Sequence, residues 1–306
     1  ATARSKREPI AVFWLLNDAL VRRDTTTALE LAEVLFRSNT PLRRYAVASF
    51  AQLAADPKAA ALLAQKLRNR PWWRHPFFVM LPEFSPDPSG PLNVMMALKA
   101  AGDRPTGDEV GRYVWDLFRR NQFGLAYYAW LNLLPEEAMA RMGLINNGGF
   151  DESSAGEPFN WHFTSHDNAT VSMQPAPDGK DGDKALQIVL GMGRVKFPKV
   201  RQYLKLPPGE YVLNGRYRGR IKSSRGLIWR AFCVDQAGKH HAIGMSDQIA
   251  GNARQWADFS FTFKFADEGV CALVLVQLEH AARTASENFI EGEVWFDALK
   301  LAAVRN

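Results

Sequence analysis

The spacing of apolar residues changes once along this chain, and the change falls within residues 144–163. Before this segment apolar residues recur every three or four positions, as in helices, whereas after it they alternate with polar residues, as in strands. The segment carries Asn-Asn-Gly-Gly at residues 146–149, a strong turn signal because Asn and Gly tolerate positive φ angles. We therefore predict two domains, residues 1–142 and 143–306, with residues 144–163 as the first strand of the second domain.

The pattern in residues 1–142 is typical of short amphipathic helices separated by capping residues and prolines. Helix pairs recur at a spacing of roughly 33 residues, which is the period of helical-repeat solenoids. Residues 28–32 and 46–54 resemble parts of the tetratricopeptide repeat, although the full consensus is not met. A helical-repeat domain is the leading interpretation, and an irregular helical bundle is the alternative. Solenoids present concave surfaces to partners, so we expect this domain to bind a protein.

Residues 258–265 alternate between polar residues and phenylalanine, which predicts a strand with one buried face. Residues 210–221 alternate in the same way. Further strands are predicted at residues 185–190, 201–206, 226–234, 270–278 and 294–301. Because these short strands follow one another without helices between them, we predict an antiparallel β-sandwich of two sheets.

The formal net charge is +6, and most of the surplus lies in residues 1–142, with 19 Lys and Arg against 14 Asp and Glu. Many of these basic residues stand near predicted helix ends, where cations complement the helix dipole. We therefore expect no nucleic-acid partner. No apolar run reaches the roughly 18 residues of a membrane span. The chain starts at Ala1 without a methionine, which is compatible with a signal or membrane anchor that was removed from it.

The residue patterns of common catalytic sites do not occur in the sequence. There is no HExxH, P-loop or GxSxG motif, and Gly-Met-Gly at residues 191–193 lacks the third glycine of a dinucleotide-binding loop. His240 and His241 are adjacent and cannot share one helix face, so we expect them in a surface loop. The carboxylates of the second half fall in no recognisable catalytic motif. We therefore expect that the protein is not an enzyme.

Cys233 and Cys271 are the two cysteines of the chain, and both lie in predicted strands. Neither has a second cysteine at the spacing of a metal site. A disulfide and two buried free thiols are the alternatives. A bridge would need Cα atoms within about 7 Å of each other and would indicate an oxidising compartment.

Two motifs in the second half resemble the first and last strands of carbohydrate-binding jelly rolls of the galactose-binding-like superfamily. They are Asn-Gly-Gly-Phe-Asp at residues 147–151 and Trp-Phe-Asp-Ala-Leu-Lys-Leu at residues 295–301. Trp161 stands where these modules carry a tryptophan after the first motif. The run Gly-Leu-Ile-Trp at residues 226–229, with Cys233 and later Cys271, resembles the β-domains found behind helical repeats in bacterial envelope proteins linked to polysaccharide production. The resemblance implies a carbohydrate-binding-module-like jelly roll over residues 143–306, on the periplasmic or extracellular face of the bacterial envelope.

The resemblance also implies a structural Ca²⁺ ion between the first and last strands, where Asp151 and Asp297 lie. Hard cations need several oxygen ligands, and backbone carbonyls would complete the set. The alternative is that both carboxylates cap turns.

Sugar binding needs flat aromatic rings that stack on pyranose faces and planar polar groups that bind hydroxyls or carboxylates. The candidate carbohydrate-binding residues are Trp161, Tyr203, Arg216, Arg218, Trp229, Arg230, Trp256, Gln277 and Trp295. Each tryptophan has a place in the core as its alternative. In residues 210–221 the apolar side chains must face the core, which puts Arg216, Arg218 and Arg220 on the opposite face of the sheet. If residues 226–234 run beside that strand, Arg230 joins the row, and the row predicts an acidic polysaccharide.

The leading hypothesis is a non-catalytic envelope protein that assists exopolysaccharide synthesis or export. Its jelly roll would hold the polysaccharide, and its helical domain would bind a protein partner. One alternative is a protein-interaction scaffold of an envelope complex without glycan binding. The other is a polysaccharide-modifying enzyme. Glycan binding separates the hypothesis from the scaffold, and turnover would reveal the enzyme. A shared fold does not decide among them.

Overall fold

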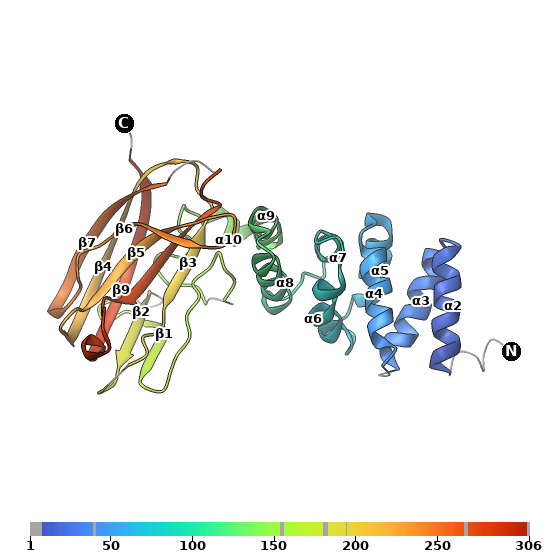
Figure 1. Cartoon of the computed structure of the whole chain (residues 1–306), viewed down its shortest axis with the longest axis horizontal. Coiled ribbons are helices and arrows are strands. Elements are labelled where there is room, and N and C mark those ends of the chain that lie inside the picture. The colour runs from blue at the N-terminus through green and yellow to red at the C-terminus, as the bar shows by residue number, and fades with distance from the viewer. Residues whose placement is uncertain are drawn as a thin grey trace. The chain divides into compact units, whose positions relative to one another are not determined.

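The computed structural model describes residues 8–38, 41–153, 156–179, 183–193, 195–265 and 269–304. The chain divides into two compact units, Ala1–Leu134 and Pro135–Asn306. Helices build the first unit, and strands build most of the second (Figure 1). The division falls before the predicted boundary at residue 142, so the short helix α10 (Glu136–Ala140) belongs to the second unit. No helix in the described ranges is both long enough and apolar enough to cross a membrane.

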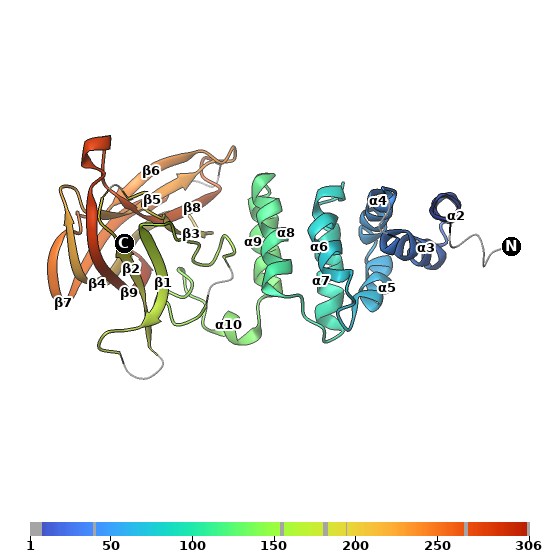
Figure 2. The same ribbon diagram turned by 90° about the horizontal axis from the view of Figure 1, so that it is seen from below.

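The first unit is a stack of helix pairs. Its helices are α2 (Pro9–Val21), α3 (Thr25–Arg37), α4 (Arg43–Ala54), α5 (Pro57–Leu67), α6 (Arg74–Phe84), α7 (Gly90–Ala100), α8 (Gly107–Arg119) and α9 (Phe123–Leu133). Helices α4, α6 and α8 contact one another in succession, and so do α5, α7 and α9 (Figures 1 and 2). The starts of α3, α5, α7 and α9 lie about 33 residues apart, which agrees with the predicted repeat. The more specific tetratricopeptide resemblance stays a prediction.

Side chains at the helix starts explain why these helices begin where they do. The Asp24 carboxylate accepts a hydrogen bond from the Thr27 backbone N–H, and Asp56 accepts one from Lys58. Thr106 and Glu109 form a reciprocal capping box at the start of α8. Each arrangement satisfies backbone N–H groups that the helix itself leaves unpaired.

A buried arginine joins α6 to α8. The Arg74 Nε lies 2.8 Å from Glu109 Oε1, and its Nη1 lies 2.7 Å from Asp103 Oδ2. Arg74 is only 2% exposed, and Nη1 also donates to the Leu67 carbonyl oxygen. An apolar sequence pattern could not indicate that an arginine at the start of α6 would be buried, because its partners Asp103 and Glu109 lie about 30 residues away.

The second unit is a sandwich of two antiparallel sheets. Its strands are β1 (Ala169–Pro175), β2 (Lys184–Leu190), β3 (Val200–Leu204), β4 (Gly209–Ser223), β5 (Leu227–Val234), β6 (His240–Met245), β7 (Gly251–Phe265), β8 (Leu273–His280) and β9 (Ile290–Ala303). One sheet has the order β1-β2-β9-β4-β7, and the other has the order β3-β8-β5-β6. The predicted fold class, a helical domain followed by an antiparallel β-sandwich, is confirmed.

Two strands were not predicted from the sequence, β1 and β6. Each lies at the edge of its sheet, and neither has the regular alternation of buried and exposed residues that β7 shows. The expected surface loop at His240 and His241 is therefore wrong, since both residues begin β6. An edge strand with few buried side chains needs no long alternating apolar pattern, so the sequence carries little signal for it.

Residues 144–163 do not form the predicted first strand. Within them Asn147 and Phe150 have positive φ angles, and the only pairing with a strand is an isolated bridge between His162 and Arg201 among the described residues. The Gly148 carbonyl oxygen accepts a hydrogen bond from Leu299 N at 2.8 Å, and a Cβ on Gly148 would overlap the Leu299 carbonyl oxygen. The segment is therefore a turn that closes tightly over β9, which an extended strand could not do.

A disulfide joins the ends of the segment that holds β6 and β7. Cys233, in β5, and Cys271, just before β8, have Cα atoms 5.4 Å apart and are 38 residues apart in sequence. Of the two alternatives left by the sequence, the structure has the bridged one.

Candidate functional site

Several predicted binding residues lie together on the outer face of the five-stranded sheet. On β4 the side chains of Tyr211 and Leu213 are buried in the sandwich. Side chains alternate along a strand, so the arginines at positions 216, 218 and 220 project from the opposite face. Trp295 on β9 and Trp256 on β7 lie on this face too, and both are partly exposed. The parity argument from the sequence is thus correct for β4.

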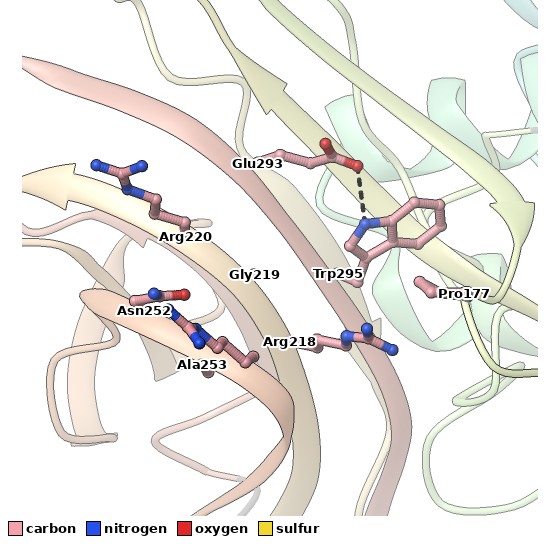
Figure 3. A pocket seen from close by; sticks show the side chains of 9 residues that line it. Pro177, Arg218, Gly219, Arg220, Asn252, Ala253, Glu293 and Trp295 are labelled. Carbon is pink, nitrogen blue, oxygen red and sulfur yellow. Dashed lines mark hydrogen bonds between the residues drawn. The ribbon is translucent and has the colours of Figure 1, made fainter.

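A hollow of about 450 Å³ opens on this face. It is lined by Pro177, Arg218, Gly219, Arg220, Asn252, Ala253, Arg254, Glu293 and Trp295. Figure 3 shows the Trp295 indole and the Arg218 side chain on one side of the hollow, and Arg220 and Asn252 on the other.

The Trp295 indole is held in place by a carboxylate. Its Nε1–H donates to Glu293 Oε1 at 2.9 Å (Figure 3). The Gln187 amide donates to the same oxygen at 2.8 Å. Gln187 comes from the neighbouring strand β2, where it pairs with Trp295 in register. The ring therefore has a fixed edge and keeps part of its surface in solvent, which is the geometry that a stacking platform needs.

Two glycines let β4 and β9 approach closely beneath this hollow. Gly219 has a φ of +143°, and a Cβ there would overlap the Glu293 carbonyl oxygen. Gly292 has a φ of +132°, and a Cβ there would overlap the Arg220 carbonyl oxygen. The pairing of β4 with β7 also shifts register between Tyr217 and Gly219. The floor of the hollow is therefore bare backbone, and the surrounding side chains form its walls.

A second hollow of about 510 Å³ lies on the same sheet and includes Trp256, Arg216 and Asp297. The Arg216 guanidinium carbon lies 4.7 Å from the centre of the Trp256 ring, a cation–π contact. Arg218 lines the first hollow and pairs with Asp178, which lines the second. The two hollows are therefore adjacent, with this ion pair at their boundary.

Two arginines of the predicted row are paired with carboxylates of the chain, and the expected membership of Arg230 in the row is wrong. Arg216 pairs with Asp297 and Arg218 with Asp178. Arg230 does not join the row, because β5 belongs to the four-stranded sheet and β4 pairs instead with β7 and β9. There Arg230 pairs with Glu279 at 2.8 Å. The partner carboxylates are distant in sequence, so the pattern along one strand could not reveal them.

Two of the predicted aromatic platforms are core residues. Trp161 is fully buried, with its ring centre 5.0 Å from that of Phe150. Trp229 is fully buried as well and stacks parallel to Phe259 at 6.0 Å. Both tryptophans belong to the hydrophobic core of the sandwich, so a sugar ring has no access to either of them.

Two further candidates, Tyr203 and Gln277, lie on the four-stranded sheet away from the hollows described above. Tyr203 is 7% exposed and Gln277 is 4% exposed, and the Gln277 amide donates to Glu279. Burial raises the pKa of the Tyr203 hydroxyl. Neither residue is brought together with Trp256 or Trp295.

A third hollow, of about 580 Å³, lies at one end of the four-stranded sheet and contains the Arg230–Glu279 pair. None of the described residues that line it is a Phe, Tyr or Trp. His280 is among them, and its Nε2 lies 3.1 Å from Ser223 Oγ. Burial lowers the pKa of His280, while the nearby Glu287 carboxylate opposes this shift. Without an aromatic ring this hollow is a poorer place for a sugar than the first two.

Asp151 and Asp297, the predicted calcium ligands, both line the second hollow, and both carboxylates accept hydrogen bonds from other groups of the chain. Asp151 Oδ1 accepts a hydrogen bond from Lys184 N at 3.0 Å. Asp297 Oδ1 accepts one from Ala298 N, and its Oδ2 binds the Arg216 guanidinium. Among the described residues no cluster of three or more His, Cys, Asp and Glu is arranged to hold a metal. The calcium site stays a prediction, and a melting temperature that responds to calcium and to a chelator would support it.

Sequence reasoning missed several residues of the first hollow. Asn252 and Arg254 lie in the part of β7 that precedes the alternating phenylalanines, and no strand was predicted there. Glu293 and Gln187 are not among the predicted carbohydrate-binding residues. Glu293 could have been predicted, because it lies two positions before Trp295 and therefore on the same face of β9.

No protein-family model matches the sequence. No curated protein matches it either. Among solved structures, the chain is similar to the CBM22-1 xylan-binding domain of Paenibacillus barcinonensis Xyn10C, with 14% identity and a TM-score of 0.35 over 52% of this chain and 93% of that chain. It is similar to a putative sugar binding protein from Bacteroides thetaiotaomicron, with 12% identity and a TM-score of 0.36 over 53% and 100%.

A third similar structure is the enzymatically active domain of tailspike protein 4 from bacteriophage CBA120. The identity is 14% and the TM-score 0.38, over 53% of this chain and 21% of that chain. At such low scores and identities we draw nothing from these likenesses about ligand or site, and the site has to be argued from its own residues.

Proposed function

We propose that the β unit binds a polysaccharide across the outer face of the five-stranded sheet. The observation that carries this proposal is the partly exposed Trp295 indole, fixed by Glu293 at the side of an open hollow. A pyranose ring presents C–H groups on its faces and hydroxyls around its edge. A restrained aromatic ring with polar groups around it matches both parts of that surface.

The polar walls of the first hollow suit hydroxyl groups. Asn252 supplies an amide that both donates and accepts hydrogen bonds, Glu293 supplies a carboxylate, and the arginines supply only donors. The second hollow places Trp256 on the same sheet face, next to the first. Two aromatic rings in adjacent hollows favour a ligand of several sugar units over a single sugar.

The test is a calorimetric titration of the full chain with a panel of oligosaccharides. We expect Trp295→Ala to weaken binding by about tenfold or more, because the platform of a binding site contributes a large share of the free energy. Trp72→Ala is the matched control, since Trp72 is 62% exposed and lies in the helical unit. If no oligosaccharide binds, or if both variants bind like the wild-type chain, the proposal is wrong.

We also propose that the protein holds the polysaccharide without altering it, during its synthesis or export at the bacterial envelope. The Cys233–Cys271 disulfide supports a periplasmic or extracellular location, because such bonds persist in oxidising compartments. Incubation with a polysaccharide that binds should release no new reducing ends. Release of such ends would favour the polysaccharide-modifying enzyme.

The helical unit is the proposed contact for a protein partner. On α2 the side chains of Ile10, Trp14 and Val21 are 65%, 68% and 82% exposed. Large apolar side chains gathered on one exposed helix mark interaction surfaces. The same observation favours the scaffold alternative, in which the protein assembles an envelope complex and binds no glycan. The oligosaccharide titration separates the two functions.

A further inference from the structure

Two arginines in the first hollow have no partner of their own. Arg220 on β4 and Arg254 on β7 are exposed, and within the residues that the structure describes neither has a hydrogen-bond or ion-pair partner. They come from neighbouring strands, because Arg220 pairs in register with Asn252, two positions before Arg254. Neighbouring strands lie about 4.8 Å apart, so two long side chains that leave them can reach a single group.

The carboxylate of this hollow is already engaged. Among the described residues that line it, Glu293 is the one acidic residue, and its Oε1 accepts hydrogen bonds from Trp295 and Gln187. These described residues thus include three guanidiniums, from Arg218, Arg220 and Arg254, and one carboxylate. Arg218 is neutralised by Asp178, and the charges of the other two remain available to a ligand.

The adjacent hollow lacks this surplus of positive charge. Among the described residues that line it, Asp151, Asp183 and Asp297 balance Lys184, Arg216 and Lys300, and Asp178 is already paired with Arg218. A negative charge on a sugar unit would therefore be attracted in the first hollow and gain no net attraction in the second. The sheet face therefore suits a ligand in which charged and uncharged units follow one another.

We propose that the first hollow receives the carboxylate of a uronic acid within a polysaccharide that alternates acidic and neutral sugars. Arg220 and Arg254 bind the carboxylate, and Trp295 stacks on the ring that carries it. The guanidinium fork matches a carboxylate in two parallel hydrogen bonds, which is why arginine rather than lysine suits this role. This inference rests on the proposed function and adds the chemical class of the ligand.

The experiment compares two ligands that differ in one group. The full chain is titrated with an oligosaccharide of alternating glucuronic acid and N-acetylglucosamine, and with the same compound after its carboxylates have been reduced to alcohols. We expect the acidic form to bind about tenfold more tightly or better at low salt, because each charge-assisted contact contributes on that scale. The preference should shrink as salt is added.

Variants assign the effect to the two arginines. Arg220→Gln together with Arg254→Gln should remove the preference, so that the acidic and the reduced forms bind with equal affinity. Lys264→Gln is the matched control, because Lys264 is exposed on the same face of β7 and lines none of the three hollows. Arg220→Lys with Arg254→Lys keeps both charges and should recover only part of the preference.

Three results would overturn the inference, and they differ in what they say of the proposed function. If the acidic and reduced forms bind equally and Trp295→Ala weakens both, the proposed polysaccharide binding is supported and the proposed uronate recognition is wrong. Equal or tighter binding of a single-stranded DNA of the same charge, or of an oligogalacturonate charged on every unit, removes the alternating ligand. Binding of neither oligosaccharide overturns the uronate and counts against the proposed function as well.

Discussion

Arginine serves different purposes in the two units of this protein. In the helical unit Arg74 is buried, and Glu109, Asp103 and a backbone carbonyl satisfy its guanidinium. On the sheet face of the β unit the arginines stand in solvent, and Arg220 and Arg254 have no partner among the described residues. An enclosed, fully paired arginine specifies how helices pack, whereas an unpaired one at the rim of a hollow is available to a ligand. Removing each kind should therefore have opposite effects on stability and on binding.

The largest effect is expected from Arg74→Ala. It leaves Glu109 buried without its partner, and breaking a buried pair in this way costs about 3–5 kcal/mol of unfolding free energy. Urea unfolding of the helical unit, followed by circular dichroism at the helix band, measures it. Arg112→Ala, which removes an exposed pair with Asp108, is the control and should cost less than about 1 kcal/mol. Similar losses in the two variants would contradict the contrast.

Removal of the Cys233–Cys271 disulfide should lower the unfolding free energy of the β unit by a comparable amount. Replacing both cysteines by alanine opens a loop whose ends are 38 residues apart, and the chain-entropy model gives a loss of about 4 kcal/mol. The loss should appear in the unfolding of the β unit and leave the helical transition in place. Two transitions that shift together would show that the units do not unfold separately.

A smaller loss is expected from Gly219→Ala. Its φ of +143° and the nearby Glu293 carbonyl exclude a side chain, so the substitution should cost about 1–3 kcal/mol. Gly102→Ala is a useful comparison, because Gly102 also has a positive φ but would meet no atom within 4 Å. A Gly219 variant that is less affected than the Gly102 variant would mean that β4 and β9 are not held so closely.

The smallest effect concerns pH. Burial depresses the pKa of His280 in the folded chain, so the neutral imidazole contributes stability that is present above its unfolded pKa of about 6.5. That contribution is lost as the pH falls below this value, because the unfolded chain then binds the proton more readily. The melting temperature of the β unit should fall between pH 8 and pH 5.5 by less in His280→Gln than in the wild-type chain. An equal fall in both would assign the effect to other groups.

Local patterns predicted much of the fold, because helix caps and strand alternation depend on residues that are close together in the sequence. Asp24, Asp56 and Thr106 cap helices as expected, and Phe259, Phe261, Phe263 and Phe265 bury one face of β7. The edge strands β1 and β6 were missed because strands with few buried side chains leave little pattern. The tight turn at Gly148 depends on its contact with Leu299, which lies at the other end of the domain.

The candidate site was predicted only in part, because its chemistry depends on contacts between distant strands. Alternation placed Arg216 and Arg218 correctly on the outer face. Their partners are 81 and 40 residues away, and the carboxylate that holds Trp295 also accepts from a side chain 106 residues away. No local rule indicates such pairings, nor that Trp229 would be enclosed by the opposite sheet while Trp295 stays partly in solvent.

The disulfide has a mechanical consequence for the proposed site. Asn252 and Arg254 lie on β7, and β7 lies within the segment whose two ends Cys233 and Cys271 join. A polymer that is pulled while these side chains hold it loads a closed covalent loop rather than an open chain. The disulfide then transmits the pulling force to β5 and β8, the two central strands of the other sheet. The binding residues on β7 should therefore stay in place even if the hydrogen bonds of β7 at the sheet edge break.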